Sequence, residues 1–132
     1  MKLIAVIEKK GGMMFNGRRL STDALLNEKI NEIANGNLFV GQYSEKLFPN
    51  AKICEDISQV ESNGFLFAED PDMIGGADEI DTVYLFHWNR AYPSDKKFGL
   101  DLKSFRLIRK EDFVGNSHKK ITLEIYEKSP SI

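Results

Sequence analysis

Residues 2–33 read KLIAVIEKKGGMMFNGRRLSTDALLNEKINEI, and the architecture expected for the rest of the chain follows from them. They open with Leu3–Ile7, five apolar residues without alternation, which is typical of a strand covered on both faces in an α/β sheet. A glycine-containing loop, Glu8–Leu20, comes next. Beyond it, apolar residues recur with the period of an α-helix at Leu26, Ile30, Ile33 and Ala34. We therefore predict a buried strand, a long loop and an amphipathic helix over Thr22–Ala34.

Asp23 is the strongest candidate for a functional residue in these positions. It lies three residues before Leu26 and seven before Ile30, so its carboxylate shares the apolar face of the predicted helix. An acid that faces the core, just beyond a buried strand and a glycine-containing loop, suits a ligand-binding or catalytic site. A plainer role stays open, because Ser21 is a good N-cap and an acid in the first turn stabilises a helix through its dipole.

The composition is that of an ordinary globular chain and argues against several functional classes. The 132 residues predict a single domain, 1–132, with 42% hydrophobic and 29% charged residues. A net charge of −2 argues against a surface for nucleic acid and against a polybasic membrane patch. No apolar run is long enough to span a membrane, and the N-terminus has no secretory signal pattern. Cys54 is the only cysteine and cannot form an internal disulfide, so we expect a cytoplasmic protein with a buried thiol.

The rest of the chain alternates between short strands and short helices. Apolar runs predict strands at 38–40, 51–54, 64–68, 82–88, 104–109 and 119–127. Short helices are predicted at 42–48 and 55–61, and a brief one begins at Asp70-Pro71. The last two strands are expected to pair antiparallel. This order predicts a mixed, mainly parallel α/β sheet with helices on both faces.

The carboxyl ends of the predicted parallel strands indicate where a ligand would bind. Ligands of such sheets bind beyond those ends, which lie near Ile7, Gly41 and Ala68. The turn at Gly41, between a strand and a short helix, also has a geometry that offers backbone N–H groups to an anion. We expect no metal site, because the acidic residues of 69–81 do not follow the EF-hand pattern: Ile74 stands where the third oxygen ligand belongs.

Taken in order, several segments resemble the dihydrofolate reductase family over most of the chain. Residues 1–26 resemble that family's opening strand, mobile substrate loop and acid-bearing helix. LFVGQYSEKLF (38–48) resembles the strand and helix that hold its cofactor motif, and FPNAK (48–52) resembles its proline-containing turn. Three further segments resemble the C-terminal third of that family: VYLFHW (83–88), the region of Asp95 and Phe98, and KSFRLIRKEDF…HKKITLEIYEK (103–128).

The resemblance implies a fold, an activity and a set of site residues. The fold is dihydrofolate reductase-like, and the reaction is hydride transfer from NADPH or NADH to a dihydrofolate or pterin-like substrate. Asp23 falls on the acid that binds the pterin ring and assists its protonation. The resemblance also places Ala5, Leu26 and Phe86 toward the substrate, and Gly17, Gly41, Gln42, Tyr43 and Ser44 toward the cofactor.

The sequence departs from the family pattern at positions that would bind ligands. Gln42 stands where an arginine binds the 2′-phosphate of the cofactor, so a preference for NADPH over NADH should weaken. Ala51 replaces an arginine that holds the glutamate tail of folate, and Phe86 replaces a hydroxyl that bonds the catalytic acid. Residues 68–70, Ala-Glu-Asp, replace a glycine pair. Their side chains block the approach of a pyrophosphate, and two carboxylates repel it.

Two functions from different classes therefore stay open. In the first, the protein is an oxidoreductase with an altered site, in which Asp23 holds a pterin-like ring and a nicotinamide supplies hydride. In the second, it is a catalytically inactive binding or regulatory module that has lost dinucleotide binding. Retention of Asp23 favours the first function, whereas the exchanges at Gln42, Ala51 and 68–70 favour the second.

Overall fold

The computed structural model describes residues 1–75 and 77–129; the end of the predicted domain, 130–132, lies outside this range. The strands are β1 (Lys2–Ile7), β2 (Gly12–Phe15), β3 (Arg18–Arg19), β4 (Leu38–Val40), β5 (Lys52–Ile53), β6 (Phe65–Phe67), β7 (Thr82–His87), β8 (Lys96–Lys97), β9 (Phe105–Phe113) and β10 (Ile121–Lys128). The helices are α1 (Ala24–Ala34) and the 3₁₀-helices η1 (Gln42–Ser44), η2 (Ile57–Gln59), η3 (Pro71–Ile74) and η4 (Ala77–Glu79).

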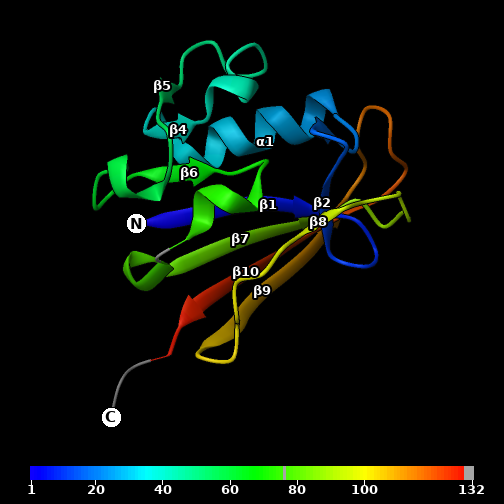
Figure 1. The fold of residues 1–132 in the computed structure, drawn as a ribbon. Helices are drawn as coiled ribbons and strands as arrows, with labels where there is room; N and C mark the ends of the chain where they lie inside the picture. The colour runs from blue at the N-terminus through cyan, green and yellow to red at the C-terminus, as the bar shows by residue number, and fades with distance from the viewer. Residues whose placement is uncertain (76, 130–132) are drawn as a thin grey trace.

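A seven-stranded mixed sheet forms the centre of the molecule (Figure 1). Its strand order is β5-β4-β6-β1-β7-β10-β9, and the first five of these strands run parallel to one another. The last two, β10 and β9, are antiparallel to their neighbours and complete the sheet on one side. The predicted α/β fold with a C-terminal antiparallel strand pair is therefore confirmed.

Strand β1 lies near the middle of the sheet and contributes to the hydrophobic core on both of its faces. Leu3, Ala5 and Ile7 belong to one cluster of buried residues, and Ile4 belongs to the other, which α1 covers with Leu26. Leu3, Ile4 and Ala5 are completely buried. This burial on both faces is the physical reason for the unbroken apolar run in the sequence.

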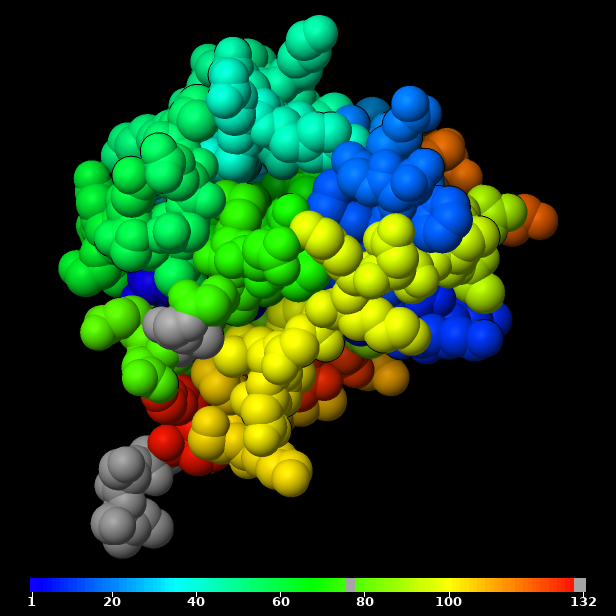
Figure 2. All heavy atoms as spheres, in the orientation of Figure 1, coloured from blue at the N-terminus to red at the C-terminus, as the bar shows by residue number. Residues whose placement is uncertain are grey.

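The prediction that helices cover both faces of the sheet is wrong for one of the two faces. The single α-helix among the described residues, α1, lies on one face, and it ends as expected at Asn35, which adopts a left-handed conformation with φ 45°. On the other face, side chains of 3₁₀ turns and of the segment 98–105 pack against the core. In Figure 2 the yellow part of this segment lies against the green chain that follows β6.

The helices predicted at 42–48 and 55–61 are too long. Only η1 and η2 form there, and the chain from η1 to Phe48 continues in turns whose N–H groups donate to the carbonyl three residues before. Segments this short form few helical hydrogen bonds, which do not offset the conformational entropy that helix nucleation costs. The tighter 3₁₀ turns form instead. The brief helix after Asp70 is confirmed as η3, capped by the Asp70 side chain.

The predicted loop Glu8–Leu20 contains a hairpin that the prediction missed. Strands β2 and β3 pair antiparallel around Asn16-Gly17, whose φ angles are 55° and 74°. Strand β8 adds to the other edge of β2, and the resulting three-stranded sheet lies at the carboxyl end of β1 (Figure 1). Asn-Gly is a strong signal for such a turn, so this hairpin was readable in the sequence.

Candidate functional site

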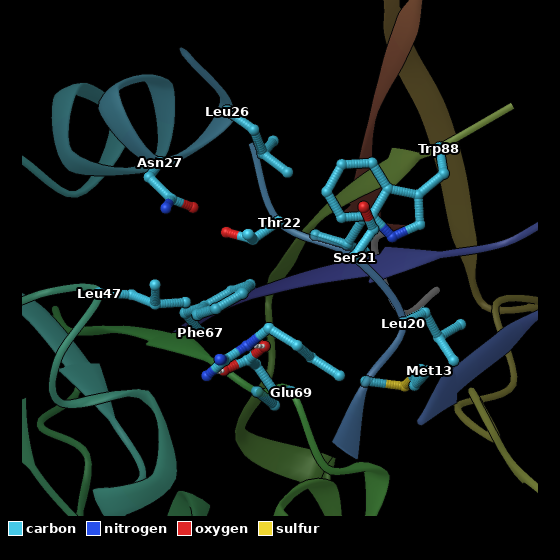
Figure 3. Close-up of a pocket in the computed structure, with 13 residues that line it drawn as sticks. Met13, Leu20, Ser21, Thr22, Leu26, Asn27, Leu47, Phe67, Glu69 and Trp88 are labelled. Carbon is cyan, nitrogen blue, oxygen red and sulfur yellow. Dashed lines mark hydrogen bonds and ion pairs between the residues drawn. The ribbon is translucent and has the colours of Figure 1, made fainter. Parts of the chain in front are cut away.

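A cavity opens where β1 and β6 end, beneath the first turns of α1 (Figure 3). It is lined by Val6, Met13, Arg19, Leu20, Ser21, Thr22, Leu26, Asn27, Leu47, Phe67, Ala68, Glu69 and Trp88. Of the three strand ends expected at a ligand site, those near Ile7 and Ala68 meet at this cavity, whereas Gly41 is not among its lining residues. The volume is about 20 Å³, which is room for about one water molecule. A small-molecule site usually measures about 300–1,000 Å³, so the cavity is closed to a ligand of that size as it stands.

Asp23 is the N-cap of α1 rather than a residue of its first turn. Its backbone is extended, and its Oδ1 accepts hydrogen bonds from the N–H groups of Leu25 (3.0 Å) and Leu26 (3.1 Å). The expectation that Ser21 caps the helix is wrong, because the chain enters the helix two residues later. The residue is 2% exposed, as its place on the apolar face predicted, but it does not line the cavity.

The loop 115–118, between β9 and β10, supplies the other donors to Asp23. Oδ1 accepts from the N–H of Asn116 at 2.9 Å, and Oδ2 accepts from the N–H and the hydroxyl of Ser117 at 2.8 and 3.2 Å. Burial alone would raise the pKa of this carboxyl, but the N–H groups of Asn116, Ser117 and Leu26 and the side chain of His118 lower it far below its usual range. Asp23 is therefore an ionised, buried carboxylate whose two oxygens are both used by the protein.

His118 completes this cluster. Its Nδ1 lies 3.1 Å from Asp23 Oδ2, and its Nε2 lies 3.2 Å from the hydroxyl of Ser21 and 3.1 Å from that of Tyr92. The ring stacks on Trp88 with a centroid separation of 4.4 Å and is 6% exposed. His118 could not be predicted from the sequence, because 95 residues separate it from Asp23 and nothing local marks the contact.

A second cluster closes the cavity on the side of β3. Arg19 donates to both carboxylate oxygens of Glu69, through Nε at 2.8 Å and Nη2 at 2.9 Å, in a bidentate ion pair. Ser44 donates its hydroxyl to the same carboxylate at 2.6 Å. The Arg19 guanidinium also lies over the Tyr43 ring, 4.5 Å from its centroid, and the hydrogen bonds that it donates to Glu69 raise the pKa of Arg19. We call Arg19, Tyr43, Ser44 and Glu69 the latch.

Three of the residues predicted to bind a cofactor, Gly41, Gln42 and Tyr43, line one open depression of about 570 Å³, and the other two, Gly17 and Ser44, do not. Ser44 and Tyr43 belong to the latch, and Gly17 lies exposed in the β2–β3 turn. The other side chains that line the depression include Glu55 and Asp70.

That depression does not suit a dinucleotide. A Cβ built on Gly41 would lie 3.1 Å from the sulfur of Met73, so the space beside this glycine is already filled. Two carboxylates and no lysine or arginine line the depression, and η1 is only three residues long. Side chains here would repel a phosphate, and a single 3₁₀ turn offers it little dipole.

The residues predicted to bind a substrate are also divided. Leu26 lines the cavity. Ala5 lies in the core on the opposite face of the sheet, and Phe86 is fully buried against Phe113, away from the cavity lining. Asn27, which the sequence analysis did not single out, presents its amide at the cavity wall (Figure 3).

Metal-binding clusters and membrane-spanning helices are both absent from the described ranges, 1–75 and 77–129. Within them, no three His, Cys, Asp or Glu side chains gather in an arrangement that would hold a metal ion. No helix in the same ranges combines the length and the apolar character needed to cross a membrane.

The chain is similar in fold to dihydrofolate reductase. The structure of dihydrofolate reductase from Enterococcus faecalis complexed with NADP(H) and RAB-propyl matches it with a TM-score of 0.73 at 10% sequence identity. The match covers 98% of this chain and 96% of that chain. No protein-family model matches the sequence, and no curated protein matches it. At this identity the similarity shows the fold alone, which is a dihydrofolate reductase-like α/β fold.

Proposed function

We propose that this protein is a small-molecule-binding module that keeps the dihydrofolate reductase-like fold and has lost nicotinamide-dependent reduction. The observation that carries the proposal is the position of the Glu69 carboxylate, held by Arg19 and Ser44 at the end of β6. The family resemblance places a glycine pair at residues 68–70, against the pyrophosphate. In this chain a fixed carboxylate takes that space.

The charge and the geometry of the site both support the loss of dinucleotide binding. Glu69 is paired bidentately, which is the strongest ordinary arrangement for a carboxylate and an arginine, so neither side chain is free for a phosphate. Breaking the pair would leave a partly buried charge unpartnered, at a penalty of about 3–5 kcal/mol. The depression at Gly41 adds acidic residues and no cation.

The ligand class is set by the cavity beneath α1. Its walls are mainly apolar, with the polar groups of Asn27, Ser21 and Thr22 on one side. This lining suits a small, uncharged and largely planar ring, and the pterin ring of a pterin or folate-like compound is the first to test. A ligand of that size requires side chains of the cavity wall to move, because the closed cavity holds about 20 Å³.

A reductase with an altered site is the second candidate. It is favoured by the presence of Leu26, Asn27 and Trp88 around one cavity at the carboxyl ends of the parallel strands. In this alternative, Asp23 would have to release hydrogen bonds from the 115–118 loop before it could hold a pterin ring.

Fluorescence of Trp88 tests the two candidates directly. Trp88 is the single tryptophan, it lines the cavity and it is 4% exposed. We expect dihydrofolate or a related pterin to change its emission, and NADPH and NADH to leave it unchanged up to millimolar concentration. The mixture should then show no loss of reduced nicotinamide. Saturable NADPH binding with turnover that disappears in Asp23→Asn would overturn the proposal and support the reductase.

A further inference from the structure

The cluster around His118 has the geometry of a serine nucleophile, a general base and a supporting acid. Ser21 Oγ lies 3.2 Å from His118 Nε2, and His118 Nδ1 lies 3.1 Å from Asp23 Oδ2. These are the two contacts that define a Ser-His-Asp triad, which is recognised by geometry and roles and occurs on unrelated folds. We propose that Ser21, His118 and Asp23 form an acyl-transfer site at the rim of the cavity, acting on small uncharged esters or thioesters.

The hydrogen bonds around Asp23 set the tautomer that such a site needs. The ionised carboxylate can only accept, which favours the tautomer of His118 whose Nδ1 carries the proton and donates it to Oδ2. The hydroxyl of Ser117, 3.0 Å from the same Nδ1, donates its own proton to Oδ2. Nε2 is then left with its lone pair toward the hydroxyl of Ser21. The side chains of His118 and Asp23 are 3% and 0% exposed, so water does not compete for this contact.

Packing holds the imidazole in place. Its ring stacks on the indole of Trp88 at an interplanar angle of 26°, and the loop that carries it is bound to Asp23 through the N–H groups of Asn116 and Ser117. A base fixed in this way loses little entropy when it receives a proton from the nucleophile.

Ser21 is the member of the triad that a substrate can reach. It lines the cavity, and Figure 3 shows it next to Trp88, on the side away from Leu47. The walls near it are apolar, and the lining cation, Arg19, is already paired with Glu69. At about 20 Å³ the cavity must widen to admit an acyl group, which favours a short chain. The lack of a free charge favours a neutral carbonyl compound.

The reaction balances without a cofactor. Ser21 Oγ attacks the carbonyl carbon while its proton passes to His118 Nε2. The bond to the alcohol or thiol then breaks, and that leaving group takes the proton from His118. In the second half, water attacks the acyl-serine and gives its proton to the same nitrogen, after which the carboxylic acid leaves and Ser21 recovers its proton.

Substitution of Tyr92 distinguishes an acyl-transfer site from a purely structural cluster. The Tyr92 hydroxyl lies 3.1 Å from the same Nε2, so it competes with Ser21 for one lone pair. Removal of this hydroxyl leaves the lone pair to Ser21. We therefore expect Tyr92→Phe to raise the rate of Ser21 acylation, whereas a structural role for the cluster predicts no gain.

Acetylation by p-nitrophenyl acetate is the first test. We expect a burst of nitrophenol and an acetyl group mapped to Ser21 by mass spectrometry. The burst should fall by about 10²-fold or more in Ser21→Ala and in His118→Gln. It should be unchanged in Ser62→Ala, an exposed serine outside the cluster. Absence of acetyl-Ser21, or an equal burst in Ser21→Ala, would overturn the proposal. The result is independent of whether NADPH binds.

A cysteine variant keeps the proposal testable if the alanine variants fail to fold. Ser21→Cys places a thiol beside the imidazole of His118, whose Nε2 lies 3.2 Å from the present hydroxyl. A thiol next to a protonated imidazole has a lowered pKa. We expect iodoacetamide to alkylate Cys at position 21 at pH 6, where Ser62→Cys reacts slowly. The native Cys54 is buried and serves as the internal reference. Equal pH profiles for the two engineered thiols would contradict the proposal.

Discussion

The carboxylate of Asp23 accepts hydrogen bonds from the first turn of α1 and from the 115–118 loop, so one substitution at residue 23 removes several contacts at once. Asp23→Ala takes away the N-cap of α1 and removes the acceptor of the hydrogen bonds from Asn116, Ser117 and His118. We expect a loss of about 3–5 kcal/mol in the free energy of unfolding. Asp23→Asn keeps a capping oxygen and should lose less, about 1–3 kcal/mol. Urea unfolding followed by circular dichroism measures both, and equal losses would contradict this account.

The pH dependence of stability follows from the same residue together with Glu8. Glu8 is 1% exposed; burial would raise its pKa, but the N–H groups of Lys10, Gly12 and Tyr92 lower it. The pKa values of Asp23 and Glu8 are thus lower in the folded protein than the values of about 4 that carboxyls have in an unfolded chain. Below about pH 4 the unfolded chain therefore binds more protons, and acid destabilises the fold.

The expected result is a plateau of stability above about pH 5 and a steady fall below about pH 4 as these carboxylates are protonated. Urea midpoints measured from pH 7 to pH 3 check it. The fall should be shallower in Asp23→Asn, because that side chain does not titrate. A variant with the same slope as the parent protein would show that Asp23 is not responsible.

At the scale of secondary-structure elements, the latch joins β3 in the small sheet to η1 and to the chain after β6. Arg19→Ala removes the bidentate partner of Glu69 and the cation over Tyr43. We expect the cavity to open and acrylamide to quench Trp88 fluorescence more strongly. Arg18→Ala is the matched control, since Arg18 is a neighbouring exposed arginine on the same short strand. Equal quenching in the two variants would show that the latch does not close the cavity.

At the scale of the whole molecule, the 115–118 loop fastens the C-terminal strand pair to the N-terminal helix. Gly115 permits this contact, because a Cβ there would lie 2.5 Å from Asp23 Oδ2 and 2.8 Å from the side chain of Ile121. We expect Gly115→Ala to destabilise the protein by about 1–3 kcal/mol through overpacking. Amide hydrogen exchange in the first turn of α1 should accelerate with it. Gly99→Ala, where a Cβ meets nothing within 4 Å, should change neither quantity.

Much of the architecture was readable from the order of apolar runs. Leu3–Ile7 predicted a strand buried on both faces, and the run over 82–88 predicted β7, because these patterns reflect burial that each strand experiences along its own length. The helical spacing after Asp23 predicted α1 for the same reason. The 3₁₀ turns at 42–44 and 57–59 were predicted as longer helices, since in such short segments tertiary packing decides between similar backbone geometries.

The chemistry of the site depended on contacts between distant parts of the chain. The sequence singled out Asp23 as a buried acid, and it is one, but its partners lie 93–95 residues away in a loop without a local signature. The pairing of Arg19 with Glu69 likewise spans 50 residues. Local patterns report how each element is buried. Only the folded sheet brings residues 21, 23 and 118 within hydrogen-bond distance, and that proximity decides what the carboxylate of Asp23 can do.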